Sequence, residues 1–188
     1  MKKRIPKKIT LDYLEISAIK YLEKYSSSES QLINILKRRI IKSCFFFKTN
    51  PEEKFELIKI VINKLKKIGL IDDKKFSENI VLNYVYKGYS KKKIKFKLKQ
   101  KNISNKNIDN AIESLNKNFF NHELASAIIF AKKKKIITLK KTDKNDKEKK
   151  LIKLSQAGFN YDTSKQIINI SNENELINLE KYANNGSN

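Results

Sequence analysis

The chain has 188 residues, of which 39% are hydrophobic and 33% are charged, and its formal net charge is +22. This composition supports a folded core, and no apolar run reaches the roughly 18 residues of a membrane-spanning helix. The single cysteine, Cys44, excludes an internal disulfide, and together with the single histidine, His122, it is too little for a metal cluster. We therefore expect a soluble protein without a metal or another cofactor.

The first predicted segments are a basic leader, residues 1–10, and a helical unit, residues 11–70. Acidic side chains at Asp12 and Glu15 fall where the apolar core of a signal peptide would run, so we expect a cytoplasmic protein. Helix starts are indicated by Ser28, with a glutamine three residues on, and by the proline that follows Asn50. Gly69 suits the left-handed residue that ends a helix.

The second predicted unit covers residues 71–120, and Asp73 and Ser90 are plausible helix caps within it. Residues 93–99 alternate polar and apolar like a half-buried strand. However, Ser90, Ile94 and Leu98 repeat the earlier Ser28, Leu32 and Leu36 at a constant offset along the chain. Since the earlier copy has helical apolar spacing, both copies are predicted to be helices.

A third copy is fainter: the segment from Leu98 to Ile103 is similar to the segment from Leu154 to Phe159. It places a third unit at residues 121–170, with a lysine-rich linker near 132–150, followed by a C-terminal tail at 171–188. The predicted fold class is therefore all-α, with three tandem three-helix repeats that form an elongated molecule because each repeat needs its neighbour to complete a core.

Signatures of catalysis are missing from the sequence. The four glycines are far apart, and none opens a phosphate-binding loop. Cys44 is interpreted as a buried thiol and His122 as a surface residue at a helix start. Asp72 and Asp73 are the one acidic pair in a distinctive setting; a metal-dependent nuclease would need further carboxylates, and helix capping is the favoured interpretation. We therefore expect no catalytic residue and no enzyme activity.

The segment from Leu65 to Phe76 resembles the junction between the first two units of RecX regulatory proteins. The matching positions include a glycine-leucine pair, a turn with aspartates and a phenylalanine, and they continue in register into the second and third units. They are Gly69, Leu70, Asp72, Asp73, Phe76, Gly88, Tyr89, Ile94, Leu98, Gly158 and Phe159. Asn102 departs from the usual glycine but tolerates the left-handed conformation. Most of these positions are expected to be structural.

The resemblance implies a curved arrangement of three three-helix units and a regulatory function. RecX-like proteins are similar in binding the RecA recombinase filament on DNA, usually along its groove. They limit its growth and activity, and so modulate recombination, DNA repair and the SOS response. The implied partners are therefore the RecA filament and DNA without sequence preference, with no membrane and no small-molecule substrate.

The predicted contact surface is the basic helix of the second unit, which carries Lys91, Lys92, Lys93, Lys95, Lys97, Lys99 and Lys101. A solvated charged face is the alternative interpretation. Only three basic residues are arginines, and lysine is the weaker choice for reading bases, so base-specific recognition is not expected. A general basic nucleic-acid-binding protein is the second functional hypothesis, although an AT-rich genome also produces a lysine excess.

Overall fold

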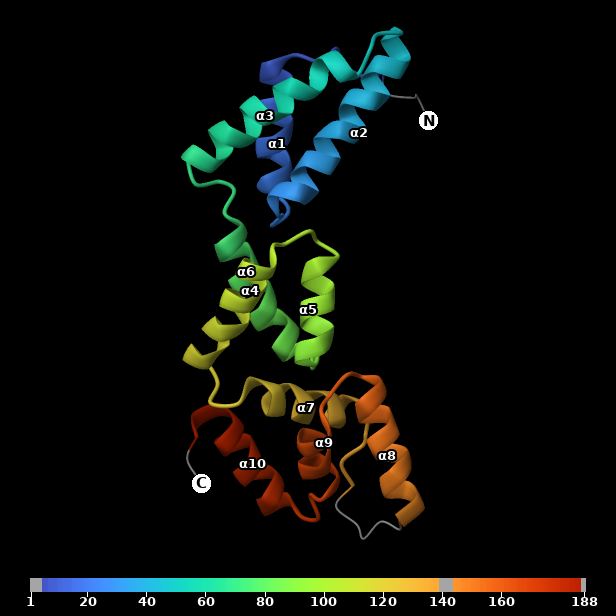
Figure 1. Ribbon diagram of the computed structural model, residues 1–188, viewed down its shortest axis with the longest axis vertical. Coiled ribbons are helices and arrows are strands. Elements are labelled where there is room, and N and C mark those ends of the chain that lie inside the picture. Colours follow the sequence, from blue (N-terminus) through green and yellow to red (C-terminus); the bar gives the residue numbers. More distant parts are fainter. Residues whose placement is uncertain (1–4, 139–143, 187–188) are drawn as a thin grey trace. The chain divides into compact units, whose positions relative to one another are not determined.

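The computed structural model describes residues 5–138 and 144–186, and every regular element within them is a helix (Figure 1). This confirms the predicted all-α class. The α-helices are α1 Leu11–Leu22, α2 Glu29–Phe47, α3 Glu52–Lys67, α4 Asp73–Tyr86, α5 Lys91–Lys99, α6 Asn105–Glu113, α7 His122–Lys133, α8 Lys144–Gln156, α9 Tyr161–Ile168 and α10 Glu173–Asn185; a 3-10 turn, η1, covers Ser114–Lys117.

The chain divides into two compact units. Unit 1 comprises the chain up to Phe76 together with Lys101–Ile103, and unit 2 comprises Ser77–Gln100 together with the chain from Ser104 onward. Helix α4 contributes its first turn to unit 1 and the rest to unit 2. The three repeat boundaries expected from the sequence follow internal similarity rather than compactness, and they stay a prediction.

Unit 1 is built on α1, α2 and α3. Their apolar residues recur every three or four positions and meet in one core that includes Leu14, Leu36 and Leu65, all with no exposed surface. The capping box predicted at Ser28 and Gln31 is present at the start of α2. Helix α3 begins at Glu52, one residue later than the sequence pattern indicated. The Asn50 side chain accepts the Glu52 amide hydrogen at 3.0 Å.

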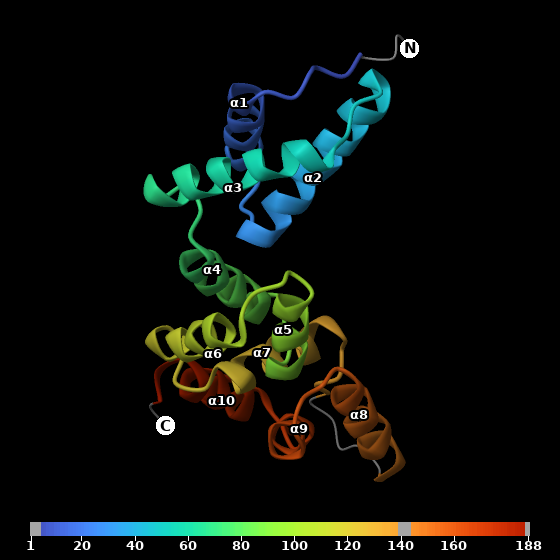
Figure 2. The same ribbon diagram turned by 45° about the horizontal axis from the view of Figure 1, so that its top comes forward.

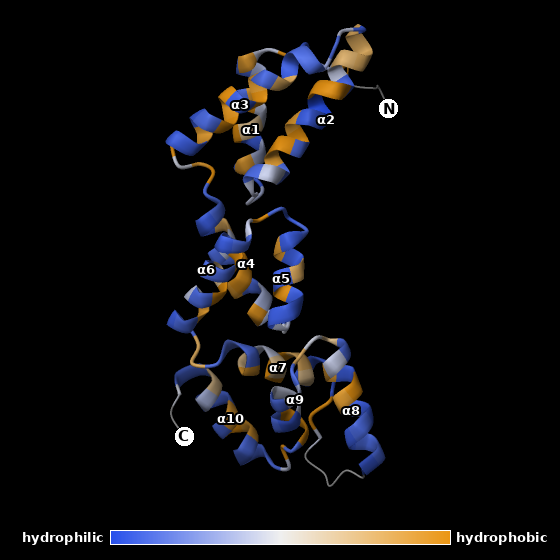
Figure 3. Ribbon diagram, viewed as in Figure 1, coloured by the Kyte–Doolittle hydropathy of each residue, from blue (hydrophilic) through white to orange (hydrophobic). Residues whose placement is uncertain are grey.

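Unit 2 contains α5 as a helix, as the internal similarity predicted. Ser90 caps it by accepting the Lys93 amide hydrogen at 3.3 Å, and Ile94 and Leu98, four residues apart, are both buried. The strand-like alternation of residues 93–99 therefore did not decide the structure. Figure 3 shows the result: α5 carries hydrophilic residues along most of its length and a narrow hydrophobic stripe.

Two segments differ from the sequence-based expectation. The predicted linker near 132–150 is helical from Lys144 onward, and Lys150 is buried, where its ammonium donates to Thr138 at 2.6 Å and pairs with Asp146 at 2.7 Å. Residues 139–143 of that linker lie outside the described residues.

The expected C-terminal tail, residues 171–188, is mostly the helix α10. It begins with Asn172 as its cap, buries Ala183 and lies beside α7 in both views of the chain (Figures 1 and 2). The carbonyls of Ala183 and Asn184 accept hydrogen bonds from Asn121 and Phe120. These contacts hold α10 to the start of α7.

Candidate functional surface

Helix α5 presents a lysine-bearing ridge to solvent, formed by Lys92, Phe96 and Lys99. Their spacing of four and three residues places them on one face, opposite the buried Ile94 and Leu98. Phe96 is 58% exposed, so its ring is accessible on that face of the helix. The ridge is therefore two cations on either side of an accessible aromatic ring.

Six of the seven predicted contact lysines lie on α5, distributed around the helix. Four of them, Lys91, Lys92, Lys93 and Lys99, are exposed on α5, and two, Lys95 and Lys97, are half-buried. The seventh, Lys101, follows the helix and belongs to unit 1, where its ammonium lies 5.8 Å from the centre of the Phe76 ring. That any of these lysines contacts a partner stays a prediction.

Some of these cations already have a partner within unit 2. The Lys95 ammonium donates to Asp109 at 2.8 Å, and this hydrogen bond is the main reason that the pKa of Asp109 is lowered. Lys93 lies over the Tyr89 ring at 4.2 Å. Lys92 and Lys99 take part in none of the ion pairs or cation–π contacts in the described part of the chain. These two ridge lysines are thus available to an anionic ligand.

The first turn of α5 is held by residues far away in the sequence. The Ser90 hydroxyl donates to the Ala157 carbonyl at 2.7 Å, and the Glu123 carboxylate accepts the Lys91 amide hydrogen at 2.7 Å. Burial is the main cause that raises the pKa of Glu123. Three lysines in the first turn repel the positive end of the helix dipole, and the Glu123 carboxylate offsets part of this repulsion.

The same arrangement occurs at the start of α2, in unit 1. There the Ser28 hydroxyl donates to the Lys101 carbonyl at 3.1 Å, and Asp73 accepts the Glu29 amide hydrogen at 2.8 Å. Burial likewise raises the pKa of Asp73. The internal similarity of the sequence thus corresponds to a repeated set of hydrogen bonds, with Lys101 and Ala157 as equivalent acceptors.

Several motif positions have structural roles that follow from this arrangement. Gly88 has φ of +77°, and a side chain there would lie 2.8 Å from the Phe130 backbone nitrogen. The Tyr89 carbonyl accepts from Ser126 at 2.6 Å. Gly158 has φ of +89°, and a side chain there would meet the Ser90 hydroxyl at 2.7 Å. Phe159 is buried and its ring centre lies 5.4 Å from that of Phe130.

The acidic pair at the start of α4 caps a helix, as expected, but the cap is Asp72 rather than Asp73. The Asp72 carboxylate accepts the amide hydrogens of Lys74 and Lys75 at 2.9 and 3.1 Å. Within the described residues, no group of three or more histidine, cysteine or acidic side chains is placed to hold a metal ion.

The remaining junction residues before and after this pair are largely structural. Gly69 ends α3 with φ of +73°, Phe76 is buried, and Leu70 is 48% exposed. Asn102 adopts φ of +54°, the left-handed conformation expected of it.

The lone cysteine and the lone histidine are both at least half-buried. Cys44 is buried, as expected. His122 begins α7, but it is half-buried rather than on the surface, and burial is the main cause that lowers its pKa.

Sequence reasoning missed the roles of Phe96 and Glu123. The spacing of Phe96 from Lys92 and Lys99 could have indicated the ridge, whereas the contact of Glu123 with Lys91 joins residues on separate helices and has no local signal.

No described helix combines the length and apolar character required to cross a membrane.

The comparisons with known proteins converge on one family. Residues 72–112, which include α5, match the model described as RecX, second three-helix domain. The chain is 27% identical over 169 residues to the regulatory protein RecX of Myxococcus xanthus (strain DK1622), a match that covers 87% of this chain and 88% of that relative.

A second relative, the regulatory protein RecX of Clostridioides difficile (strain 630), is 29% identical over 170 residues, covering 85% of this chain and 73% of the relative. Among solved structures, a crystal structure of regulatory protein RecX has a TM-score of 0.59 and 19% sequence identity. The match covers 84% of this chain and 70% of that one, and it shows that the two share a fold.

Proposed function

The chain belongs to the RecX family of regulatory proteins, and from this premise we propose that it binds the RecA recombinase filament on DNA and inhibits its growth and activity. This action damps recombination, DNA repair and the SOS response. The observation that carries the proposal is the family match over residues 72–112, because this segment contains the ridge of Lys92, Phe96 and Lys99. The role requires binding alone, without a catalytic residue or cofactor.

The ridge has the chemistry of a contact with an anionic partner. Lys92 and Lys99 have no ion-pair partner in the described part of the chain, and Phe96 adds an exposed apolar centre between them. Lysines are point charges, so the ridge suits an acidic protein face or DNA phosphates without sequence preference. The place of the chain in the cytoplasm, where RecA acts, is part of the same proposal.

The test is ATP hydrolysis by the cognate RecA on single-stranded DNA, measured at fixed salt while this protein is titrated in. Inhibition at protein concentrations well below that of RecA, and unchanged when excess duplex DNA is added, is the expected result. Absence of inhibition across a broad titration would refute the proposal.

Variants of the ridge make the test specific. The double variant Lys92→Ala, Lys99→Ala should weaken inhibition by about tenfold or more, because each unpaired cation contributes to the contact. Its matched control, Lys149→Ala, Lys153→Ala, removes the same charge from exposed positions of α8. Equal effects of the two double variants would show that net charge, and not the ridge, determines inhibition.

The second candidate function is general binding of nucleic acid, which the net charge of +22 favours. In that case the protein binds unrelated single and double strands with comparable affinity, and binding falls steeply with salt. Inhibition of RecA would then disappear when excess duplex DNA is added, since the protein would only compete for DNA. The same titration therefore separates the two functions.

A further inference from the structure

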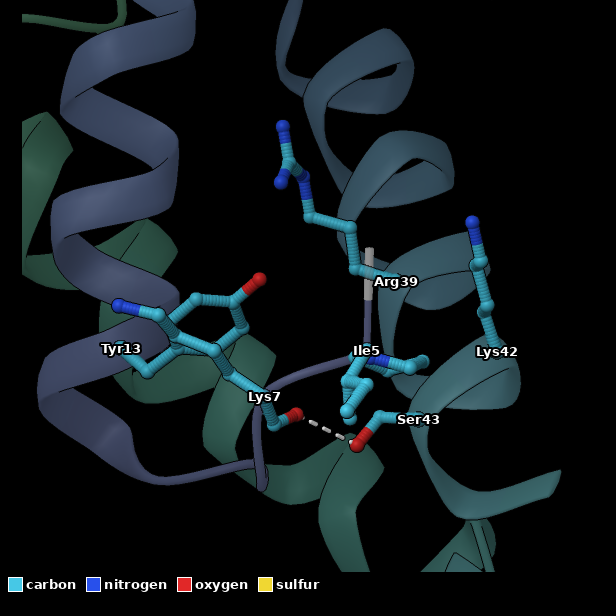
Figure 4. A pocket seen from close by; sticks show the side chains of 7 residues that line it. Ile5, Lys7, Tyr13, Arg39, Lys42 and Ser43 are labelled. Atoms are coloured by element: carbon cyan, nitrogen blue, oxygen red, sulfur yellow. Dashed lines mark hydrogen bonds between the residues drawn. The ribbon is translucent and has the colours of Figure 1, made fainter. Parts of the chain in front are cut away.

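Unit 1 contains a cationic pocket that the proposed function does not use. Its volume is about 600 Å³, and it lies where the segment before α1 crosses between α1 and α2 (Figure 4). Basic side chains of Lys7, Arg39 and Lys42 line it, and the Tyr13 hydroxyl is directed toward the space between the two helices. The Ser43 hydroxyl donates to the Lys7 carbonyl at 2.7 Å and so fixes the crossing segment against α2.

Within the described residues, the three cations of this pocket form no ion pair. In the described part of the chain, the ion pairs of unit 1 join Lys59 with Glu56, Lys64 with Glu15, and Lys66 with Glu29, and they leave out the pocket cations. Arg39 is one of only three arginines in the sequence, and its planar guanidinium can hold two oxygens of a phosphate at once. The pocket therefore has the charge and donors that a phosphate group requires.

Two exposed aromatic rings follow the pocket along α2. Phe45 is 88% exposed and Phe46 is 51% exposed, and they lie three and four residues beyond Lys42, within one helical turn. The Phe46 ring is held edge-on by Phe47 at 5.0 Å between ring centres. Neither ring belongs to the core of unit 1, and nearly all of the Phe45 side chain is accessible to a ligand.

We infer that the pocket and the two rings form a binding site for single-stranded nucleic acid, with a backbone phosphate at Arg39 and Lys42 and a base against Phe45. Sites for single strands combine a basic groove with aromatic side chains on which unpaired bases stack. A duplex offers the phosphates but keeps its bases stacked inside, so it can use only half of the site. This inference stands independently of the proposed RecA filament contact.

The test is fluorescence anisotropy of a labelled 20-nucleotide oligothymidylate with the full chain, in the absence of RecA, over a range of salt concentrations. The double variant Arg39→Ala, Lys42→Ala should bind about tenfold more weakly or worse, and its salt dependence should fall by about 1.4 in slope, the equivalent of two phosphate contacts. The matched control Lys20→Ala, Lys67→Ala removes the same charge from exposed positions of α1 and α3. Equal losses in both double variants would overturn the proposal.

Replacement of Phe45 separates stacking from apolar contact. Phe45→Ala and Phe45→Leu should both weaken oligothymidylate binding by about fivefold or more, since leucine keeps the apolar surface but has no ring for a base. Duplex DNA should bind both variants as it binds the original chain. Retention of full affinity by Phe45→Leu would contradict stacking, and so would tighter binding of anionic lipid vesicles than of the oligonucleotide through the same residues.

Photo-crosslinking locates the ligand directly. An oligonucleotide that carries 5-iododeoxyuridine should crosslink to the peptide that contains Phe45 and Phe46, identified by mass spectrometry after digestion. Crosslinks confined to unit 2 would overturn the site while leaving the RecA inhibition test unaffected. Conversely, failure of that inhibition test would leave these crosslinks in place.

Discussion

The hydroxyl of Ser90 donates a 2.7 Å hydrogen bond to the carbonyl of Ala157, far along the chain, while it caps α5 by accepting the Lys93 amide hydrogen. One buried side chain thus joins the start of the lysine-bearing helix to the turn between α8 and α9. The two bonds have separable consequences for stability.

Replacement of Ser90 by alanine should lower the free energy of unfolding by about 2 kcal/mol, because it removes a helix cap and leaves a partly buried carbonyl without its donor. Ser104→Ala is the matched control, since Ser104 caps α6 in the same way from an exposed position. It should lose only about 1 kcal/mol. Urea unfolding followed by circular dichroism measures both, and equal losses would assign no stability to the bond with Ala157.

Gly158→Ala should destabilise unit 2 by about 1–3 kcal/mol, because its φ of +89° strains any side chain and the new methyl group meets the Ser90 hydroxyl at 2.7 Å. Gly69→Ala has a similar φ, +73°, but open space around the added atom, and should lose about 1 kcal/mol. The same urea experiment compares them. A greater loss at Gly69 would mean that the close approach of Gly158 to Ser90 does not restrict the side chain.

The half-buried carboxyl of Glu123 should make unit 2 less stable as pH rises. Burial raises its pKa, so the folded state binds the proton more tightly than the unfolded state. This contribution to stability is present below the unfolded pKa and is lost as pH rises through the folded pKa. In Glu123→Gln, the amide oxygen can still accept the Lys91 hydrogen. The stability of this variant relative to the original chain should therefore be higher at pH 7 than at pH 4.

The control is Glu175, which should change stability with pH in the opposite direction. Hydrogen bonds from the Ser171 backbone and hydroxyl lower the pKa of Glu175, so its stabilisation is present above the unfolded pKa and is lost as pH falls. The stability of Glu175→Gln relative to the original chain should be lower at pH 7 than at pH 4. Urea midpoints at the two pH values check both variants, and shifts of the same sign would contradict the assignment.

Tyr182→Ala should destabilise the packing of α10 by about 1–2 kcal/mol, because the ring contacts Phe120 edge-on, with 5.2 Å between ring centres. Tyr161→Ala, at a position that is 64% exposed, should change stability by less than about 0.5 kcal/mol. Thermal unfolding monitored by circular dichroism compares them. An unaffected Tyr182→Ala variant would show that residues 173–185 do not pack on α7 in solution.

The helical class and the helix α5 were predictable because local signals and internal similarity agreed. Ser28 and Ser90 show the same cap and the same apolar spacing after it, and this outweighed the alternation of residues 93–99. Helix α10 was also legible in principle, since Asn172 with Glu175 is a capping signal and Leu176, Leu179 and Ala183 have helical spacing. It was not predicted because most of its residues are polar.

The tertiary contacts were beyond sequence reasoning. Nothing near Glu123 indicates that its carboxylate reaches the Lys91 amide, and nothing near Lys150 indicates that its ammonium is buried against Thr138. Such contacts depend on how helices meet, which periodicity does not specify. For the same reason the sequence placed Lys101 with the other lysines, although it belongs to unit 1.

The hydrogen bonds that Ser90 and Glu123 make at the first turn of α5 couple ligand binding at the ridge to the stability of helices later in the sequence. When α7 or the turn at Ala157 opens, the first turn of α5 loses the Glu123 acceptor or the bond that anchors Ser90, so a ligand that requires α5 in helical form opposes that opening. The reverse holds with equal free energy. Occupancy of the ridge should consequently slow amide hydrogen exchange in α7 as well as in α5.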